Sequence, residues 1–165
     1  MKIIKNALSD SLCQECLDAI KHIEQNYPWY PSSVIWIPEL KEGIQGTCLT
    51  RFAPEDLKTR ILDELEYCLS SSEPIVQFYI WQPLSGIAWH NDYNHNIGAT
   101  IYLNKQWGPN YGGIFMYQPG TDPTDIHGVI PQQNTMVIND KNEYHMVTPV
   151  AFDVPEYRYT IQIWG

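Results

Sequence analysis

The chain has 165 residues and a formal net charge of −9 at pH 7. Nucleic-acid backbones and anionic membranes would repel such a surface, so neither is expected as the main partner. No stretch approaches the roughly 20 apolar residues that cross a bilayer, and the first six residues lack a signal-peptide core. We therefore expect a soluble cytoplasmic protein with a single domain, residues 1–165. The sequence leaves the oligomeric state open.

Residues 1–72 are expected to form a scaffold of two helices with short strands between them. Apolar side chains at helical spacing predict one helix over residues 9–26, which Ser9 or Ser11 can cap. Between the helices, β-branched and aromatic residues predict strands at 33–37 and 47–52, separated by a turn at 41–43. A second helix is expected to begin at Pro54, with a buried stripe formed by Leu57, Ile61, Leu65 and Cys68 or Leu69.

The four cysteines are not expected to form a site. Cys13 and Cys16 have the spacing of a zinc-binding or redox pair, but they fall within the first predicted helix, while Cys48 and Cys68 are scattered. Free buried thiols are the better interpretation in a chain without an export signal.

From residue 73 onward, short apolar or aromatic runs alternate with turn residues. They predict eight strands, at 75–81, 87–90, 97–103, 113–117, 126–130, 135–138, 143–147 and 158–164. Eight short strands separated by turns are typical of a double-sheet jelly roll. We expect a mainly β fold with α, in which residues 73–165 form the jelly roll and the two N-terminal helices brace one sheet.

The segment His90-Asn91-Asp92 contains the first candidate site residues. Side chains two positions apart in an extended segment point to the same face, so His90 and Asp92 can reach one metal ion. His145, 55 residues after His90, lies in another predicted strand. A second histidine would complete the 2-His-1-carboxylate set typical of non-haem Fe(II) oxygenases.

Arg158 is the candidate for binding a cosubstrate. It opens the last predicted strand, 13 residues after His145. Three protein ligands leave metal positions open, and a dianionic cosubstrate that chelates through one end needs a cation for its other end. The planar guanidinium group suits a carboxylate.

Together these residues resemble the 2-oxoglutarate- and Fe(II)-dependent oxygenases, specifically their prolyl-4-hydroxylase-like branch. The resemblance covers about residues 77–164. Its anchors are the segments QFY at 77–79, HND at 90–92, IYLNKQW at 101–107, GG at 112–113, HMVTPV at 145–150 and RYTIQIW at 158–164.

The resemblance implies a double-stranded β-helix with Fe(II), 2-oxoglutarate and O₂ as cofactor and cosubstrates. His90, Asp92 and His145 would bind the iron, and Arg158 would pair with the far carboxylate of 2-oxoglutarate. Three further residues are implied at the cosubstrate, with Tyr102 and Thr160 near Arg158 and Tyr79 nearer the chelating end. In this family 2-oxoglutarate becomes succinate and CO₂ as the substrate is hydroxylated.

The chain departs from the family pattern at residues 152–155, which form an insertion before Arg158 that can displace its side chain. We expect a dioxygenase that hydroxylates a protein or peptide side chain, with proline first by resemblance, and a small-molecule substrate as the other possibility. Two alternatives stay open: a metal-binding jelly-roll module without catalysis, and a cupin-type metalloenzyme that uses no 2-oxoglutarate. Succinate release distinguishes the enzyme from the binding module.

Overall fold

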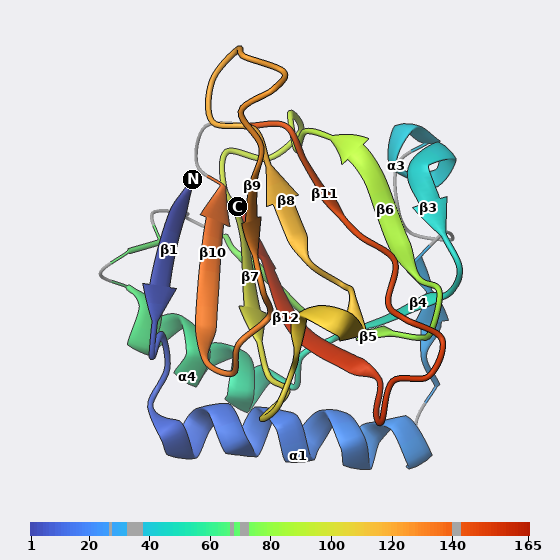
Figure 1. The fold of residues 1–165 in the computed structure, drawn as a ribbon. Coiled ribbons are helices and arrows are strands. Elements are labelled where there is room, and N and C mark those ends of the chain that lie inside the picture. Colours follow the sequence, from blue (N-terminus) through green and yellow to red (C-terminus); the bar gives the residue numbers. More distant parts are fainter. Residues whose placement is uncertain (27, 33–37, 67, 70–72, 140–142) are drawn as a thin grey trace.

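The computed structural model describes residues 1–26, 28–32, 38–66, 68–69, 73–139 and 143–165. Within these residues the strands form two antiparallel sheets that face each other (Figure 1). The large sheet has the order β1 (Lys2–Lys5), β10 (Thr135–Asn139), β7 (Gly98–Tyr102), β12 (Arg158–Trp164), β5 (Ile75–Trp81), β4 (Cys48–Phe52) and β2 (Tyr30–Pro31). The small sheet has the order β3 (Ile44–Gln45), β6 (Gly86–His90), β11 (His145–Val147), β8 (Phe115–Tyr117) and β9 (His127–Val129).

The eight strands predicted after residue 73 are all present, as β5 to β12. The largest differences are at the strand ends, where β7, β8, β9 and β11 are each two residues shorter than predicted. Their arrangement in two antiparallel sheets confirms the jelly roll. The connection between β8 and β9 projects beyond the sandwich at the top of Figure 1.

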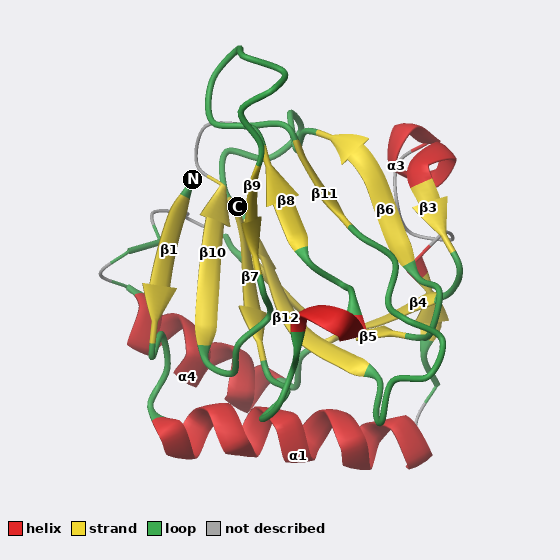
Figure 2. Cartoon of the chain, viewed as in Figure 1, coloured by secondary structure: helices red, strands yellow, loops and turns green. Residues whose placement is uncertain are grey.

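Two helices, α1 (Asp10–Asn26) and α4 (Glu55–Leu65), cover the outer face of the large sheet, as predicted. Figure 2 shows both of them on the same side of the molecule. Ser9 caps α1, because its hydroxyl accepts a hydrogen bond from the Leu12 amide. The apolar stripes of the helices, including Ile20 and Ile61, pack on Phe78 and Ile161 of the sheet. None of the helices in the described residues is long and apolar enough to cross a bilayer.

Some predictions for residues 1–72 were wrong. The second helix ends at Leu65, so Cys68 and Leu69 pack against the core from outside it. The turn predicted at 41–43 is the end of a short helix, α3 (Pro38–Gly43), which begins at a proline, a favoured first helical residue. The strand predicted at 33–37 lies outside the described residues.

Three strands had not been predicted. β2 and β3 have two residues each, too few to show an alternating pattern. β1 has two adjacent isoleucines rather than alternation, and it forms because it pairs with β10 at the edge of the large sheet. The four cysteines are free thiols; Cys13, Cys16 and Cys48 are buried and Cys68 is partly buried.

A second apolar cluster fills the space between the sheets. It includes Tyr79, Trp81 and Tyr102 from the large sheet and Phe115 and Val147 from the small sheet. Since alternate residues of a strand share a face, β12 directs Arg158, Thr160, Gln162 and Trp164 inward. These four side chains follow one another along the interior between the sheets, and the candidate site lies along them.

Candidate metal centre and anion pocket

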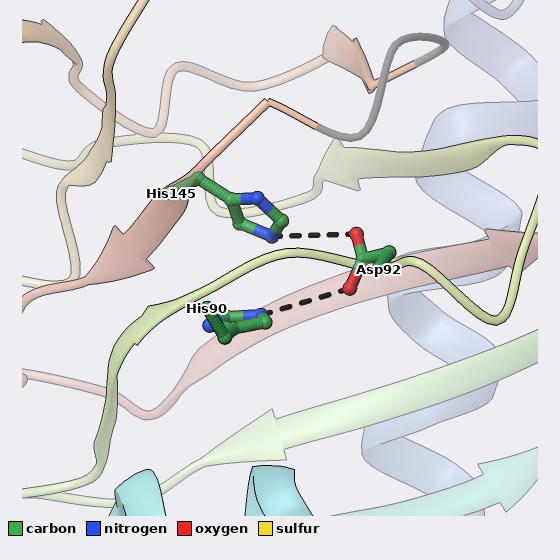
Figure 3. A group of neighbouring side chains, drawn as sticks. All are labelled: His90, Asp92 and His145. Atoms are coloured by element: carbon green, nitrogen blue, oxygen red, sulfur yellow. Dashed lines mark ion pairs between the residues drawn. The ribbon is translucent and has the colours of Figure 1, made fainter. Parts of the chain in front are cut away.

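The structure brings His90, Asp92 and His145 together at one end of the sandwich (Figure 3). His90 is the last residue of β6, Asp92 follows it by two residues, and His145 is the first residue of β11. β6 and β11 are adjacent, and His145 lies directly opposite His90 in their register. Residues 55 positions apart in the sequence thus become cross-strand neighbours with both rings facing the interior.

The geometry of the three side chains is that of a metal-binding group. One potential ligand atom from each lies within 4.8 Å of the others. The Asp92 carboxylate faces both rings, with Oδ1 3.7 Å from His90 Nε2 and Oδ2 3.4 Å from His145 Nε2. The ring centroids of the two histidines are 4.2 Å apart.

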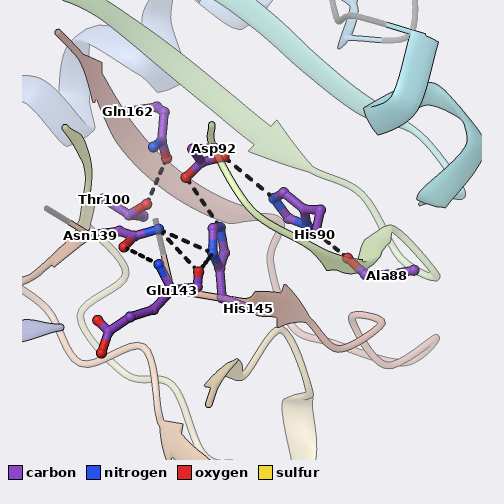
Figure 4. Close-up of polar contacts among 8 residues, drawn as sticks. All are labelled: Ala88, His90, Asp92, Thr100, Asn139, Glu143, His145 and Gln162. Carbon is purple, nitrogen blue, oxygen red and sulfur yellow. Dashed lines mark hydrogen bonds and ion pairs between the residues drawn. The ribbon is translucent and has the colours of Figure 1, made fainter. Parts of the chain in front are cut away.

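Backbone contacts set the tautomers of both histidines (Figure 4). His90 Nδ1 lies 2.8 Å from the Ala88 carbonyl oxygen, and His145 Nδ1 lies 2.9 Å from that of Glu143. A carbonyl oxygen only accepts, so each Nδ1 carries the proton and each neutral ring turns an Nε2 lone pair toward Asp92. Burial, reinforced by neighbouring His145, lowers the pKa of His90 to about 4, which keeps its ring neutral near pH 7.

Two further residues support this cluster. The Asn139 side chain accepts a hydrogen bond from the Glu143 amide and donates one to its carbonyl oxygen, the group that holds His145. At Gly98, an added Cβ would lie 3.1 Å from Asp92 Oδ2 and 3.2 Å from the Trp164 ring. Any larger residue at this position would crowd the carboxylate and the Trp164 ring.

These donors fit a divalent first-row metal. Two imidazole nitrogens and one carboxylate, all turned toward one point, form the 2-His-1-carboxylate set that binds non-haem Fe(II). Without a cation, the two lone pairs and the carboxylate would repel one another.

A cavity leads from the two histidines into the interior, toward Arg158. Gln162 and Thr100 line its middle, where the Thr100 hydroxyl donates a hydrogen bond of 2.6 Å to Gln162. Arg158, 1% exposed, forms the deep end. None of its three guanidinium nitrogens has a hydrogen-bond partner among the described residues. A buried charge of this kind is costly unless an anion pairs with it, so the deep end fits a carboxylate.

The surroundings of Arg158 hold its guanidinium in place. Its central carbon lies 5.1 Å from the ring centroid of Trp81 and 5.2 Å from that of Tyr102. Burial raises the pKa of Tyr102 to about 12, although the Arg158 charge opposes this, and the hydroxyl stays protonated. Gly113 gives the side chain room: its φ is +60°, and an added Cβ would lie 2.6 Å from Arg158 Cδ.

The predicted cosubstrate residues occupy two levels. Tyr102, Tyr79 and Thr160 are cross-strand neighbours, one step along β12 from Arg158. The Tyr79 hydroxyl donates to the side chain of Gln77, which lies on the side of the metal cluster rather than that of Arg158. The insertion at 152–155 does not displace Arg158, because it turns outward and leaves Phe152 78% exposed.

Sequence reasoning missed four residues that support the site: Trp81, Gly98, Gly113 and Asn139. The Gly112-Gly113 pair was noted only as part of the resemblance, although the positive φ of both residues is a reason for glycine. The other three show no sequence signal, because their importance comes from contacts across strands.

Trp89 and Tyr93, next to the ligands, are 43% and 56% exposed and do not line the cavity.

An open groove of about 700 Å³ lies at the β4 side of the large sheet, lined by residues of β4 and of α1, the helix on the outer face of that sheet. Tyr30, Phe52 and Gln77 are among its lining residues. Gln77 lines the groove and accepts a hydrogen bond from Tyr79, which lines the cavity, so this pair of side chains lies between the two spaces. The groove contains no metal-binding cluster among the described residues, so the chemistry belongs to the cavity.

Residues 76–165 match the family model described as the 2OG-Fe(II) oxygenase superfamily. Among curated proteins none matches the chain.

Solved structures share its fold at low identity. A prolyl-4-hydroxylase from Pseudomonas putida has a TM-score of 0.70 and 17% identity, over 99% of this chain and 90% of that chain. A prolyl hydroxylase from Trichoplax adhaerens, in complex with a hypoxia inducible factor peptide fragment, has a TM-score of 0.78 and 17% identity, over 99% and 81%. An α-ketoglutarate-dependent epimerase of nogalamycin biosynthesis has a TM-score of 0.69 and 13% identity, over 99% and 76%.

Proposed function

Because the chain belongs to the 2OG-Fe(II) oxygenase superfamily, we propose that it hydroxylates an unactivated C–H bond in a protein or peptide side chain. Prolyl residues are the first substrates to test. Bound Fe(II), together with 2-oxoglutarate and O₂, supplies the oxidising power, and the cosubstrate leaves as succinate and CO₂. The rest of the reaction depends on how this chain binds, orients and shields its ligands.

The observation that carries the proposal is the two-ended site. A cluster with the donor set for Fe(II) lies at one end of the cavity, and a fully buried guanidinium without a hydrogen-bond partner among the described residues lies at the other. 2-Oxoglutarate has a matching two-ended structure, with a chelating keto acid at one end and a carboxylate at the other. A metal-binding module or a cupin-type enzyme without this cosubstrate has no use for Arg158.

Each residue then has a distinct task. His90, Asp92 and His145 hold the metal through the lone pairs that the structure turns toward one point. Arg158 pairs with the distal carboxylate, to which Tyr102 and Thr160 donate hydrogen bonds. Tyr79 lies closer to the chelating end. The apolar walls of the cavity exclude water from the reacting atoms.

Two features support a peptide substrate. One structural neighbour is a prolyl hydroxylase in complex with a peptide fragment. The groove lined by β4 and α1 offers room for an extended polymer, separated from the cavity by the hydrogen-bonded pair Gln77 and Tyr79. The epimerase with the same fold acts in the biosynthesis of a small molecule, so the fold alone does not decide the substrate class.

The first experiment measures cosubstrate turnover. Fe(II) protein supplied with 2-oxoglutarate and O₂ should release succinate, and Asp92→Ala should release none. The second experiment offers a panel of proline-containing peptides and matched peptides with alanine in place of proline, and looks for the gain of one oxygen atom by mass spectrometry. Succinate release without oxidation of any peptide would reject the peptide substrate and keep the oxygenase. Absence of any 2-oxoglutarate binding would reject the proposal as a whole.

A further inference from the structure

Trp81 contacts two groups at the deep end of the cavity. It lies directly opposite Arg158 in the pairing of β5 with β12, so its ring packs against the guanidinium at 5.1 Å from carbon to centroid. Its indole nitrogen donates a buried hydrogen bond of 3.2 Å to the Thr160 hydroxyl oxygen. The same side chain therefore contacts both Arg158 and the neighbouring hydroxyl.

The direction of the second contact follows from the chemistry of indole. The Trp81 N–H can only donate, so the Thr160 oxygen must accept. The Thr160 hydroxyl proton is therefore not used in the contact with Trp81, and it can be donated to a ligand. A hydroxyl group without the indole donor would be free to rotate and offer its oxygen to the guanidinium instead.

With this orientation, donor groups of three neighbouring side chains gather around the deep end: Arg158 lines the cavity, and Tyr102 and Thr160 form the next cross-strand pair along β12. The guanidinium of Arg158 contributes N–H groups, and the Tyr102 hydroxyl, which also has no hydrogen-bond partner among the residues described, contributes an O–H. The Thr160 proton completes the set. A guanidinium with two hydroxyl donors beside it is complementary to a carboxylate, which only accepts and carries the opposite charge.

We propose that Trp81 is a positioning residue for the distal carboxylate of the cosubstrate. It acts through Thr160, whose hydroxyl it fixes as a donor, and it holds the guanidinium of Arg158 against its ring. This inference rests on the proposed function, because it takes 2-oxoglutarate as the ligand of the deep pocket.

A double-mutant cycle tests the coupling between Trp81 and Thr160. Trp81→Phe keeps an aromatic ring beside Arg158 and removes the N–H, and Thr160→Val removes the hydroxyl while keeping the shape. The dissociation constant of 2-oxoglutarate is measured anaerobically on Fe(II) protein, from the visible charge-transfer band that forms on chelation. The Fe(II) dissociation constant of each variant is measured separately, and it should not change.

We expect Thr160→Val to raise the 2-oxoglutarate dissociation constant roughly 10-fold or more, as for loss of a hydrogen bond to a charged group. Trp81→Phe should raise it about 3- to 10-fold in the unaltered background, within the range of one neutral hydrogen bond. In the Thr160→Val background the same change should have a much smaller effect, because the hydroxyl that Trp81 orients is gone.

Equal effects of Trp81→Phe in both backgrounds would overturn the proposal, since they would show that Trp81 acts by packing alone. If Trp81→Phe does not fold, benzothienylalanine at position 81 keeps the bicyclic shape without the N–H and takes its place in the cycle. Failure of the unaltered Fe(II) protein to bind 2-oxoglutarate would reject the proposed function, and this inference with it.

Discussion

Arg158→Met should weaken 2-oxoglutarate binding without lowering the stability of the protein. The change keeps an unbranched, flexible side chain and removes the buried charge. The guanidinium is 1% exposed and its nitrogens have no hydrogen-bond partner in the part of the chain that the structure describes. Burying an ion costs several kcal/mol even after the protein relaxes. The contacts with the rings of Trp81 and Tyr102 offset part of this cost, at about 2 kcal/mol each for a desolvated cation.

We therefore expect the variant, without cosubstrate, to be at least as stable as the unaltered protein, with a gain of up to ~1–3 kcal/mol in the free energy of unfolding. Binding of 2-oxoglutarate should weaken roughly 10- to 150-fold, which corresponds to the ~1.5–3 kcal/mol of hydrogen bonds to a charged group. Fe(II) binding should be unchanged, because the metal ligands are at the other end of the cavity.

Urea denaturation with and without 2-oxoglutarate measures both effects. At 100 times its dissociation constant the cosubstrate should stabilise the unaltered Fe(II) protein by about 2.7 kcal/mol, and at the same concentration it should do little for the variant. Lys105→Met, at an exposed position outside the cavity, is the matched control and should behave like the unaltered protein. A variant that is clearly less stable and binds 2-oxoglutarate with an unchanged dissociation constant would refute the reasoning, since Arg158 would then be a structural residue.

Three further changes test other parts of the structure. Asp92→Ala should weaken Fe(II) binding at least about 10-fold in a calorimetric titration and leave the far-UV circular dichroism unchanged, because it removes the only anionic ligand of the cluster; tight binding of one equivalent would show that Asp92 is no ligand. Gly98→Ala should also weaken Fe(II) binding, since its Cβ would lie 3.1 Å from the Asp92 carboxylate. An unchanged metal affinity there would mean that the carboxylate shifts without loss. Ile61→Ala, in the helix that braces the large sheet, should lower the free energy of unfolding by ~2–5 kcal/mol in urea and leave the Fe(II) affinity of the folded protein unchanged, because Ile61 is fully buried on the side away from the site. A loss below ~1 kcal/mol would show that the helix contributes little to the core.

The sequence was most informative where one pattern decides the structure. The eight strands after residue 73 could be predicted because turn residues bound each apolar run, and the two long helices because their stripes repeat at helical spacing. His90 and Asp92 could be paired because an extended segment places them on one face. The place of β1 could not be predicted, because what forms it is pairing with β10 rather than its own residues.

The supporting residues of the site were beyond the reach of sequence reasoning for a similar reason. Trp81 looked like any aromatic residue of a strand until the register placed it opposite Arg158 and beside Thr160. Gly98 looked like an ordinary strand glycine until the Asp92 carboxylate was found against it. Such roles depend on which strands pair and in which register. A local sequence pattern predicts neither the pairing nor the register.

The two ends of the site belong to different halves of the sandwich. The histidines come from β6 and β11 of the small sheet, whereas Arg158, Thr160, Tyr102 and Tyr79 come from β12, β7 and β5 of the large one. A cosubstrate bound at one end by the metal and at the other by Arg158 therefore bridges the two sheets, and its binding should stabilise their contact. Iron alone connects the small sheet only to Asp92, so loading the metal without the cosubstrate leaves the two sheets as free to separate as they are in the metal-free protein. Slow amide exchange on both sheets at once would then mark the arrival of the cosubstrate rather than that of the metal.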